Sequence, residues 1–292
     1  MRATLGNRIA MHALAIAATV LLGALLSAMM IRMAPGFDVD EQQLDSHLNA
    51  QSLQALRDSR LGQKNIFRFY VHSLGRSQHG DLGTSLSLGQ PVSALIRQRG
   101  PLTLRLIGMG LVLSWCMALT LALSAGLLRV DAYDALSAIV SGTFLCLPAA
   151  ILALLSVLWN VPGSIVIALI VFPRLYRYAR NLLGQAYDMP HIVTARAKGL
   201  RELRILLCHV APVVGPQLLA VGGVSVSMAV GAAIPVEALC GLAGVGQLAW
   251  QAALARDLPL LVNLTVLVTL ITLLANSGAD VMSHALKGQQ QA

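Results

Sequence analysis

One polar stretch, Thr194–Pro212, contains the residue types and the spacing that point most clearly to a function. Within it the cations Arg196 and Lys198 alternate with small residues, and Gly199 follows directly. Small side chains beside a glycine let another surface approach the backbone closely. The chemistry that this pattern predicts is the docking of a partner, and not a reaction.

Catalytic and metal-binding patterns are absent from the sequence. It contains no phosphate-binding loop, no zinc-protease helix and no nucleophile elbow. The four cysteines and seven histidines are dispersed, without the spacing of metal ligands or of a disulfide framework. We therefore expect a chain that is not an enzyme and that binds no metal or cofactor itself.

The elements that must hold the polar stretch are apolar. The chain is 56% hydrophobic and only 12% charged, whereas a soluble domain has about a quarter charged residues. A helix of roughly 20 apolar residues spans a bilayer, and runs near that length occur at 9–31, 106–128, 135–159, 212–234 and 258–279. A shorter run, 161–172, reaches spanning length only if its helix continues through Pro173 to about Arg180. We predict an all-α membrane protein with six transmembrane helices.

Short basic loops orient these spans. Arginine and lysine prefer cytoplasmic loops, which predicts that both termini are cytoplasmic. The net charge of +8 follows from this topology and gives no reason to invoke nucleic acid. The predicted parts are a cytoplasmic N-terminus 1–8, a first helix 9–31, an extracytoplasmic segment 32–101 with a helix at 42–61, a membrane core 102–284 that includes a cytoplasmic loop 184–212 and an outer loop 235–258, and a cytoplasmic tail 285–292.

The predicted spans carry no acidic residue near their middle. A proton-coupled transporter would need titratable groups there, and only His12 comes close, in the first turn of its span. Energy for any transport must therefore come from another polypeptide.

The polar stretch reads as a helix, a bend at Gly199 and a second helix. Residues 201–207 place Leu203, Leu206 and Leu207 on one helical face, and Pro212 begins the next span. An interfacial helix lying on anionic lipid is the alternative that these residues leave open.

The spacing of this stretch resembles the cytoplasmic EAA loop of the permeases of binding-protein-dependent ABC importers. Ala195, Gly199 and Pro212 stand where that motif has its last alanine, its glycine and its proline. Val193 and Thr194 replace its first two letters. The form of the motif is similar to that of the dipeptide/oligopeptide/nickel branch, where the glutamate is often absent.

Two further stretches resemble the same branch. Gly80–Ser85 with Gln90–Val92 is similar to its segment ahead of the second span, and 236–246 with 255–259 is similar to its segment between the last two spans. The long outer segment resembles the first of the two permeases in such importers. Ala243 replaces a family proline, and only about 160–163 connects spans three and four, where the family usually has a longer loop.

The resemblance implies a permease of the bacterial cytoplasmic (inner) membrane that forms half of a pathway for short peptides or a similar small solute. Its implied partners are a second permease, one or two ABC ATPases that hold ATP and Mg, and an extracytoplasmic solute-binding protein. The implied ATPase-docking residues are Ala195, Arg196, Ala197, Lys198, Gly199, Leu200, Glu202 and Pro212. The implied outer loop and pathway mouth comprise Glu237, Gly241, Gly244, Gly246, Arg256 and Asp257.

Several alternatives stay open. Glu237 either faces the pathway mouth or holds the outer loop by hydrogen bonds. A nickel or metal-chelate importer of the same branch is the near alternative in function. A membrane scaffold without transport and an exporter component are the alternatives from other classes.

Overall fold

A computed structural model describes residues 18–19, 22–23, 82–128 and 130–290 of the chain. Almost all of the predicted first span and all of the predicted outer helix at 42–61 lie outside these residues. The chain divides into two compact units. The first unit is Met1–Gly100 with Leu248–Leu270, and the second is Pro101–Gln247 with Ile271–Ala292.

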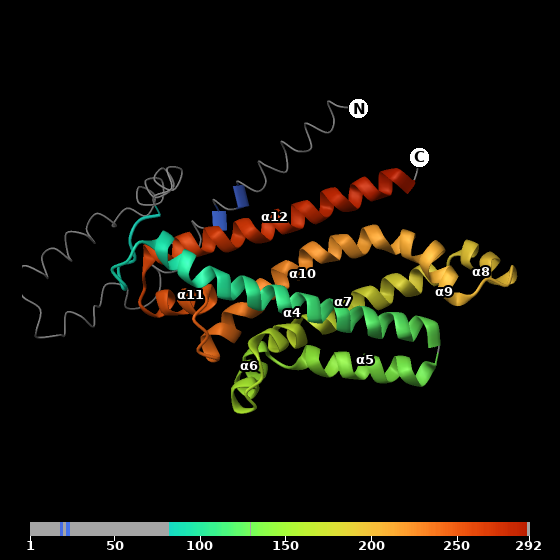
Figure 1. Cartoon of the computed structure of the whole chain (residues 1–292), viewed down its shortest axis with the longest axis horizontal. Coiled ribbons are helices and arrows are strands. Elements are labelled where there is room, and N and C mark those ends of the chain that lie inside the picture. Colours follow the sequence, from blue (N-terminus) through green and yellow to red (C-terminus); the bar gives the residue numbers. More distant parts are fainter. Residues whose placement is uncertain (1–17, 20–21, 24–81, 129, 291–292) are drawn as a thin grey trace, which may run out of the picture. The chain divides into compact units, whose positions relative to one another are not determined.

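The described residues are helical, with no strand beyond an isolated bridge between Thr84 and Pro91 (Figure 1). This agrees with the predicted all-α class. The helices are α4 (Val92–Leu128), α5 (Asp131–Cys146), α6 (Ala149–Leu158), α7 (Gly163–Tyr187), α8 (Pro190–Ala197), α9 (Glu202–Ile205), the π-helix η2 (Leu206–Val210), α10 (Ala211–Leu239), α11 (Val245–Leu254) and α12 (Leu258–Gln290).

Three described helical stretches are long and apolar enough to cross a membrane, namely Val92–Leu127, Glu202–Leu239 and Leu258–Leu286. A fourth is added if the bent pair Ala132–Cys146 and Ala149–Leu158 counts as one broken span. The predicted total of six therefore stays a prediction.

The third span was predicted as one helix over 135–159, and that form is wrong. The chain turns by 93° between α5 and α6, because Leu147 is extended, with φ −77° and ψ 124°, and Pro148 precedes the first residue of α6. Proline disfavours the helical conformation of the residue before it. The predicted short connection to the next span is present, since α6 ends at Leu158 and α7 begins at Gly163.

Helix α7 is the centre of the second unit. It continues through Pro173 as predicted and runs beyond Arg180 to Tyr187. It packs against α5, α6 and α10, and its buried face includes Phe172 and Leu175. Arg174 and Arg177 of α7 are exposed, so α7 is amphipathic where the other long helices are apolar.

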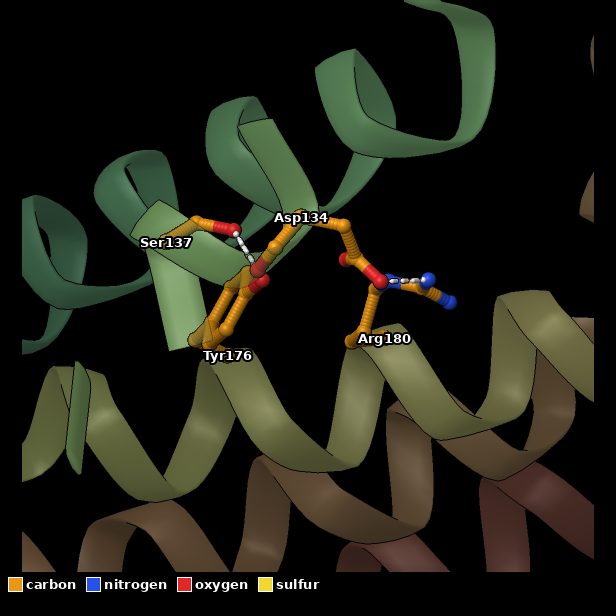
Figure 2. Close-up of polar contacts among 4 residues, drawn as sticks. All are labelled: Asp134, Ser137, Tyr176 and Arg180. Atoms are coloured by element: carbon orange, nitrogen blue, oxygen red, sulfur yellow. Dashed lines mark hydrogen bonds and ion pairs between the residues drawn. The ribbon is translucent and has the colours of Figure 1, made fainter. Parts of the chain in front are cut away.

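Polar contacts join α7 to α5 in addition to this packing. Figure 2 shows Asp134 and Ser137 of α5 facing Arg180 and Tyr176 of α7. Both carboxylate oxygens of Asp134 accept from Arg180, Oδ1 from Nε at 2.6 Å and Oδ2 from Nη2 at 2.5 Å. The hydroxyl oxygens of Ser137 and Tyr176 lie 2.6 Å apart. A bidentate pair of this kind fixes geometry as well as adding attraction, so α5 and α7 are held in one register.

Candidate functional site

The polar stretch forms the helix, bend and second helix that the sequence predicts. Helix α8 starts at Pro190, whose missing N–H costs nothing in the first turn. It ends at Ala197, with Lys198 as its C-cap, and Gly199 follows with φ +73°. The Leu200 amide donates to the Ala195 carbonyl (3.3 Å) and the Gly199 amide to that of Arg196 (2.8 Å). These are the two bonds of a Schellman cap, which needs a left-handed residue at the position of Gly199.

The cap separates exposed residues of this segment from buried ones. Ala197, Lys198 and Gly199 are exposed, and a Cβ atom on Gly199 would meet nothing within 4 Å. Ala195 is buried in the core and Leu200 is half-buried against it. Of the residues predicted to dock, the exposed three are therefore accessible to a partner and Ala195 is not.

The predicted leucine face is divided in the structure. Leu206 is 6% exposed, whereas Leu203 and Leu207 are 59% and 61% exposed. Val193 on α8 is exposed as well. Exposed apolar side chains thus lie on both sides of the Gly199 bend, among the exposed cations Lys198, Arg201 and Arg204.

A π turn begins at Leu206. The Ala211 amide donates to the carbonyl of Leu206, five residues back, just before Pro212, which has no amide hydrogen to donate. The extra residue rotates the helix face relative to a regular α-helix. The stretch from Glu202 to Leu239 is one helical run, so Pro212 lies inside a helix and does not begin one. That the membrane span begins at Pro212 stays a prediction.

The side chains of Tyr187, Arg196 and Glu202 contact one another next to the bend. Arg196 Nε donates to Glu202 Oε1 at 2.8 Å, and the Arg196 guanidinium carbon lies 5.7 Å from the ring centroid of Tyr187. Tyr187 is the last residue of α7. Burial, and then the negative charge of Glu202, raise the pKa of its hydroxyl group, so the phenol stays neutral.

Glu237 lies inside the second unit, in the last turn of α10, and its side chain is fully buried. Its Oε2 atom accepts from the amide of Gly246 at 2.6 Å and more weakly from that of Gln247 at 3.4 Å. The hydroxyl oxygen of Thr103 accepts from the amide of Val245 at 2.8 Å. The first amides of α11, which have no partner within their own helix, are thus capped by side chains. This arrangement favours the loop-holding reading of Glu237.

The predicted loop glycines fall into two groups. A side chain on Gly244 would overlap the carboxyl group of Glu237, and a Cβ on Gly246 would lie 2.7 Å from the Cα atom of Ile234. Gly241 instead has φ +65° and open space around it. Gly244 and Gly246 are therefore required by close packing, and Gly241 by its backbone conformation.

Asp257 belongs to the first unit and is also buried. Its Oδ2 atom accepts from the hydroxyl of Ser85 (2.5 Å) and from the amide and hydroxyl of Ser87 (3.0 and 2.8 Å). Its Oδ1 atom accepts from the amide of Leu260 at 3.1 Å, which caps α12. Two motif stretches that are far apart in sequence are thereby joined. Arg256 beside it is exposed, with φ +53°.

Sequence reasoning missed the supporting residues Tyr187 and Thr103, and it named Ser85 only as part of a motif stretch. Each acts on a residue of another element, so no local spacing signals the contact. No group of three or more histidine, cysteine, aspartate or glutamate side chains suited to a metal occurs in the part of the chain that the structure describes.

Comparison with known proteins identifies relatives along most of the chain. Residues 118–288 match the family described as "Binding-protein-dependent transport system inner membrane component". A protein of Brucella abortus (strain 2308) named as a peptide transport system permease is 30% identical over 208 residues. That match includes 62% of this chain, and the chain spans 66% of the length of this curated relative.

Two further relatives align over more of their length. A Brucella suis biovar 1 (strain 1330) protein named as a peptide permease is 24% identical over 307 residues, with 94% of this chain and 95% of the relative covered. The nickel import system permease protein NikB of Staphylococcus aureus (strain bovine RF122 / ET3-1) is 22% identical over 284 residues, with 91% and 86% covered. Since the family match spans more than half of the sequence, this chain belongs to the family of binding-protein-dependent transport system inner membrane components, as its motifs predicted.

Proposed function

We propose that this chain is one of two permease subunits of an ATP-driven importer, coupled to its ATPases through α8, the Gly199 bend and α9. The family assignment supports the permease role. The observation that carries the coupling role is the exposed bend, where Lys198 and Gly199 lie between the exposed apolar side chains of Val193 and Leu203. An apolar surface rimmed by cations suits a protein groove that has an acidic rim.

The cycle follows from this placement. A solute-binding protein delivers the substrate to the pathway between the two permeases. ATP draws the ATPases together, and the α8–α9 segment passes their displacement to the membrane helices as a rigid-body movement. ATP hydrolysis, with its Mg, takes place in the partner subunits. ATP must bind the closed state of the ATPases more tightly than the open state, because a ligand shifts a conformational equilibrium only towards a state that it binds more tightly. This chain itself supplies no catalytic group.

Short peptides or a similar small solute are the proposed substrate, and a nickel chelate is the second candidate. Relatives named for peptide transport and for nickel import both align with this chain. The proposed location is the bacterial inner membrane, with several spans and both termini in the cytoplasm.

Recovery of an ABC ATPase with the tagged chain tests the coupling role. The chain is purified from membranes that also express the ATPase genes encoded beside it, as wild type, as Gly199→Trp and as Gly241→Trp. Both glycines have positive φ and open space, so the two variants carry a similar backbone strain. We expect Gly199→Trp to abolish recovery and Gly241→Trp to retain it.

Two outcomes would contradict the proposal. One is a wild-type chain that is well inserted and brings down no ATPase, which would favour a scaffold. The other is equal recovery with Gly199→Trp, which would move the docking surface away from the bend.

A further inference from the structure

Three side chains from three consecutive helices meet behind the Gly199 bend. Tyr187 ends α7, Arg196 lies in the last turn of α8, and Glu202 begins α9. All three belong to the second unit. Arg196 and Glu202 were predicted as part of the docking loop from their place in the motif, whereas Tyr187 was not singled out.

One atom of each charged group is turned away from solvent. Arg196 Nη2 and Glu202 Oε2 are both inaccessible to solvent, so these two atoms cannot touch a partner that approaches from outside. The two side chains as a whole are 31% and 38% exposed, and Lys198 and Gly199 between them are exposed. The inward-facing atoms of Arg196 and Glu202 therefore face the rest of the chain, which gives the pair a supporting role at the bend.

Their contacts close the bend. The ion pair between Arg196 Nε and Glu202 Oε1, at 2.8 Å, connects the helix before Gly199 to the helix after it. The Schellman cap fixes the backbone of the bend only as far as Leu200. The ion pair extends that restraint into α9, so α8 and α9 can move as one body.

Tyr187 fastens this body to the membrane helices. The Arg196 guanidinium lies 5.7 Å from the Tyr187 ring centroid, within the range of about 6 Å for a cation–π contact. The same ring also lies close to α4, since a Cβ atom on Gly126 would lie 3.3 Å from Tyr187 Cε2. The tyrosine thus contacts both α4 and the α8–α9 segment, and it is covalently part of α7.

We propose that Tyr187, Arg196 and Glu202 form a positioning clamp that holds the α8–α9 segment rigid against α7 and α4. The clamp rests on the proposed function, because it matters only if this segment receives the displacement of an ATPase. A loosely attached segment would absorb that displacement by bending at Gly199. A clamped segment passes it to α7, which is itself tied to α5 through Arg180 and Asp134.

The first test measures the order of the segment in the chain alone. A spin label is placed on Lys198→Cys in the full chain, in detergent, with the native cysteines replaced by alanine. We expect Glu202→Gln to raise the ratio of mobile to immobile label roughly twofold to fivefold, the range for one partly exposed ion pair. The charge exchange Arg196→Glu with Glu202→Arg re-forms the ion pair but loses the contact of Arg196 with the Tyr187 ring, so we expect it to restore part of the order. Tyr187→Phe, which keeps the ring, should leave the label more ordered than Tyr187→Leu.

Asp134→Asn is the matched control. It breaks an ion pair whose side chains are 33% and 41% exposed, against 31% and 38% for Arg196 and Glu202. The control is expected to leave the label at position 198 unchanged. Equal mobility in wild type and Glu202→Gln, or an equal increase in Asp134→Asn, overturns the clamp.

The second test separates the clamp from the docking role. ABC ATPase is recovered with the unlabelled wild type, Glu202→Gln and the charge-exchanged chain. We expect recovery to fall roughly twofold to fivefold in Glu202→Gln and to return in part in the exchanged chain. No recovery by wild type overturns the proposed function and the positioning role with it. Full recovery by Glu202→Gln, when its label is mobile, overturns only the positioning role.

Discussion

The turns at Gly199 and Gly241 in the second unit have a similar backbone conformation but different surroundings. At the end of α8 the Leu200 amide donates to the Ala195 carbonyl, and at the end of α10 the Leu242 amide donates to that of Glu237 (2.9 Å). Each turn has a positive-φ glycine followed by leucine, Gly199 with Leu200 and Gly241 with Leu242. The local sequence signal and this bond of the cap are therefore the same.

The difference lies in where the polar groups around each turn are directed. Around Gly241 the carboxylate of Glu237 is buried, and Gly246 packs closely against α10. Around Gly199 the cations Lys198 and Arg201 are exposed, and nothing crowds the glycine. The Gly241 turn satisfies its polar groups within the chain, whereas the Gly199 turn leaves an open, charged surface. A glycine at a motif position can thus belong to a turn that packs against its own chain, or to a turn that stays accessible to a partner.

The strongest test of the packed turn is Gly246→Val. Its Cβ would lie 2.7 Å from the Ile234 Cα atom and 3.1 Å from the Ala233 carbonyl oxygen. Since backbone atoms cannot rotate away, α11 must shift, and we expect a loss of about 3 kcal/mol of stability. Thermal denaturation followed by size-exclusion chromatography in detergent measures it. A fully stable variant would mean that the turn is open like that at Gly199.

Asp257 extends the comparison to the first unit. Replacing it with alanine removes the acceptor of the Ser85 hydroxyl, the Ser87 amide and the Leu260 amide. Each is a hydrogen bond to a buried carboxylate, so we expect a loss of about 2–3 kcal/mol, allowing for partial rescue by water. The same denaturation assay checks this, with Arg256→Ala as the exposed neighbouring control, expected to change stability by less than about 0.5 kcal/mol.

For Glu237→Ala we expect the next largest loss of stability, about 2 kcal/mol. It leaves the amides of Gly246 and Gln247 without their acceptor in a buried place. Glu237→Gln keeps a side-chain oxygen that can accept, so its loss should be smaller and substrate uptake should continue. Uptake abolished by Glu237→Gln in a stable, well-inserted protein would instead assign the carboxylate to the pathway mouth.

Much of this architecture is predictable because its signals are local. The apolar runs predict the long helices, and the spacing of Ala195 and Gly199 predicts the bend. The break at Leu147 was missed because proline in an apolar run is ambiguous. Pro173 and Pro235 lie inside continuous helices, whereas Pro148 ends one.

The parts of the site that were not predicted depend on tertiary contacts. The helical period places Leu203, Leu206 and Leu207 on one face but does not say which of them the core covers. It also contains no sign of the π turn at Leu206–Val210. The support of Arg196 by Tyr187 and the capping of α11 by Glu237 join residues on different helices. Only the fold determines which of these distant side chains meet.

The smallest expected effect tests what the two turns share. Gly199→Ala and Gly241→Ala each force a Cβ atom into a left-handed conformation, at about 1–2 kcal/mol, and neither meets a neighbouring atom within 4 Å. Asparagine tolerates this conformation better, so Gly199→Asn and Gly241→Asn should each recover part of the loss. Equal losses in the two alanine variants, measured by thermal denaturation, would show that the turns are equivalent as backbone. Any difference in ATPase recovery between them would then come from the surface around Gly199 and not from the cap.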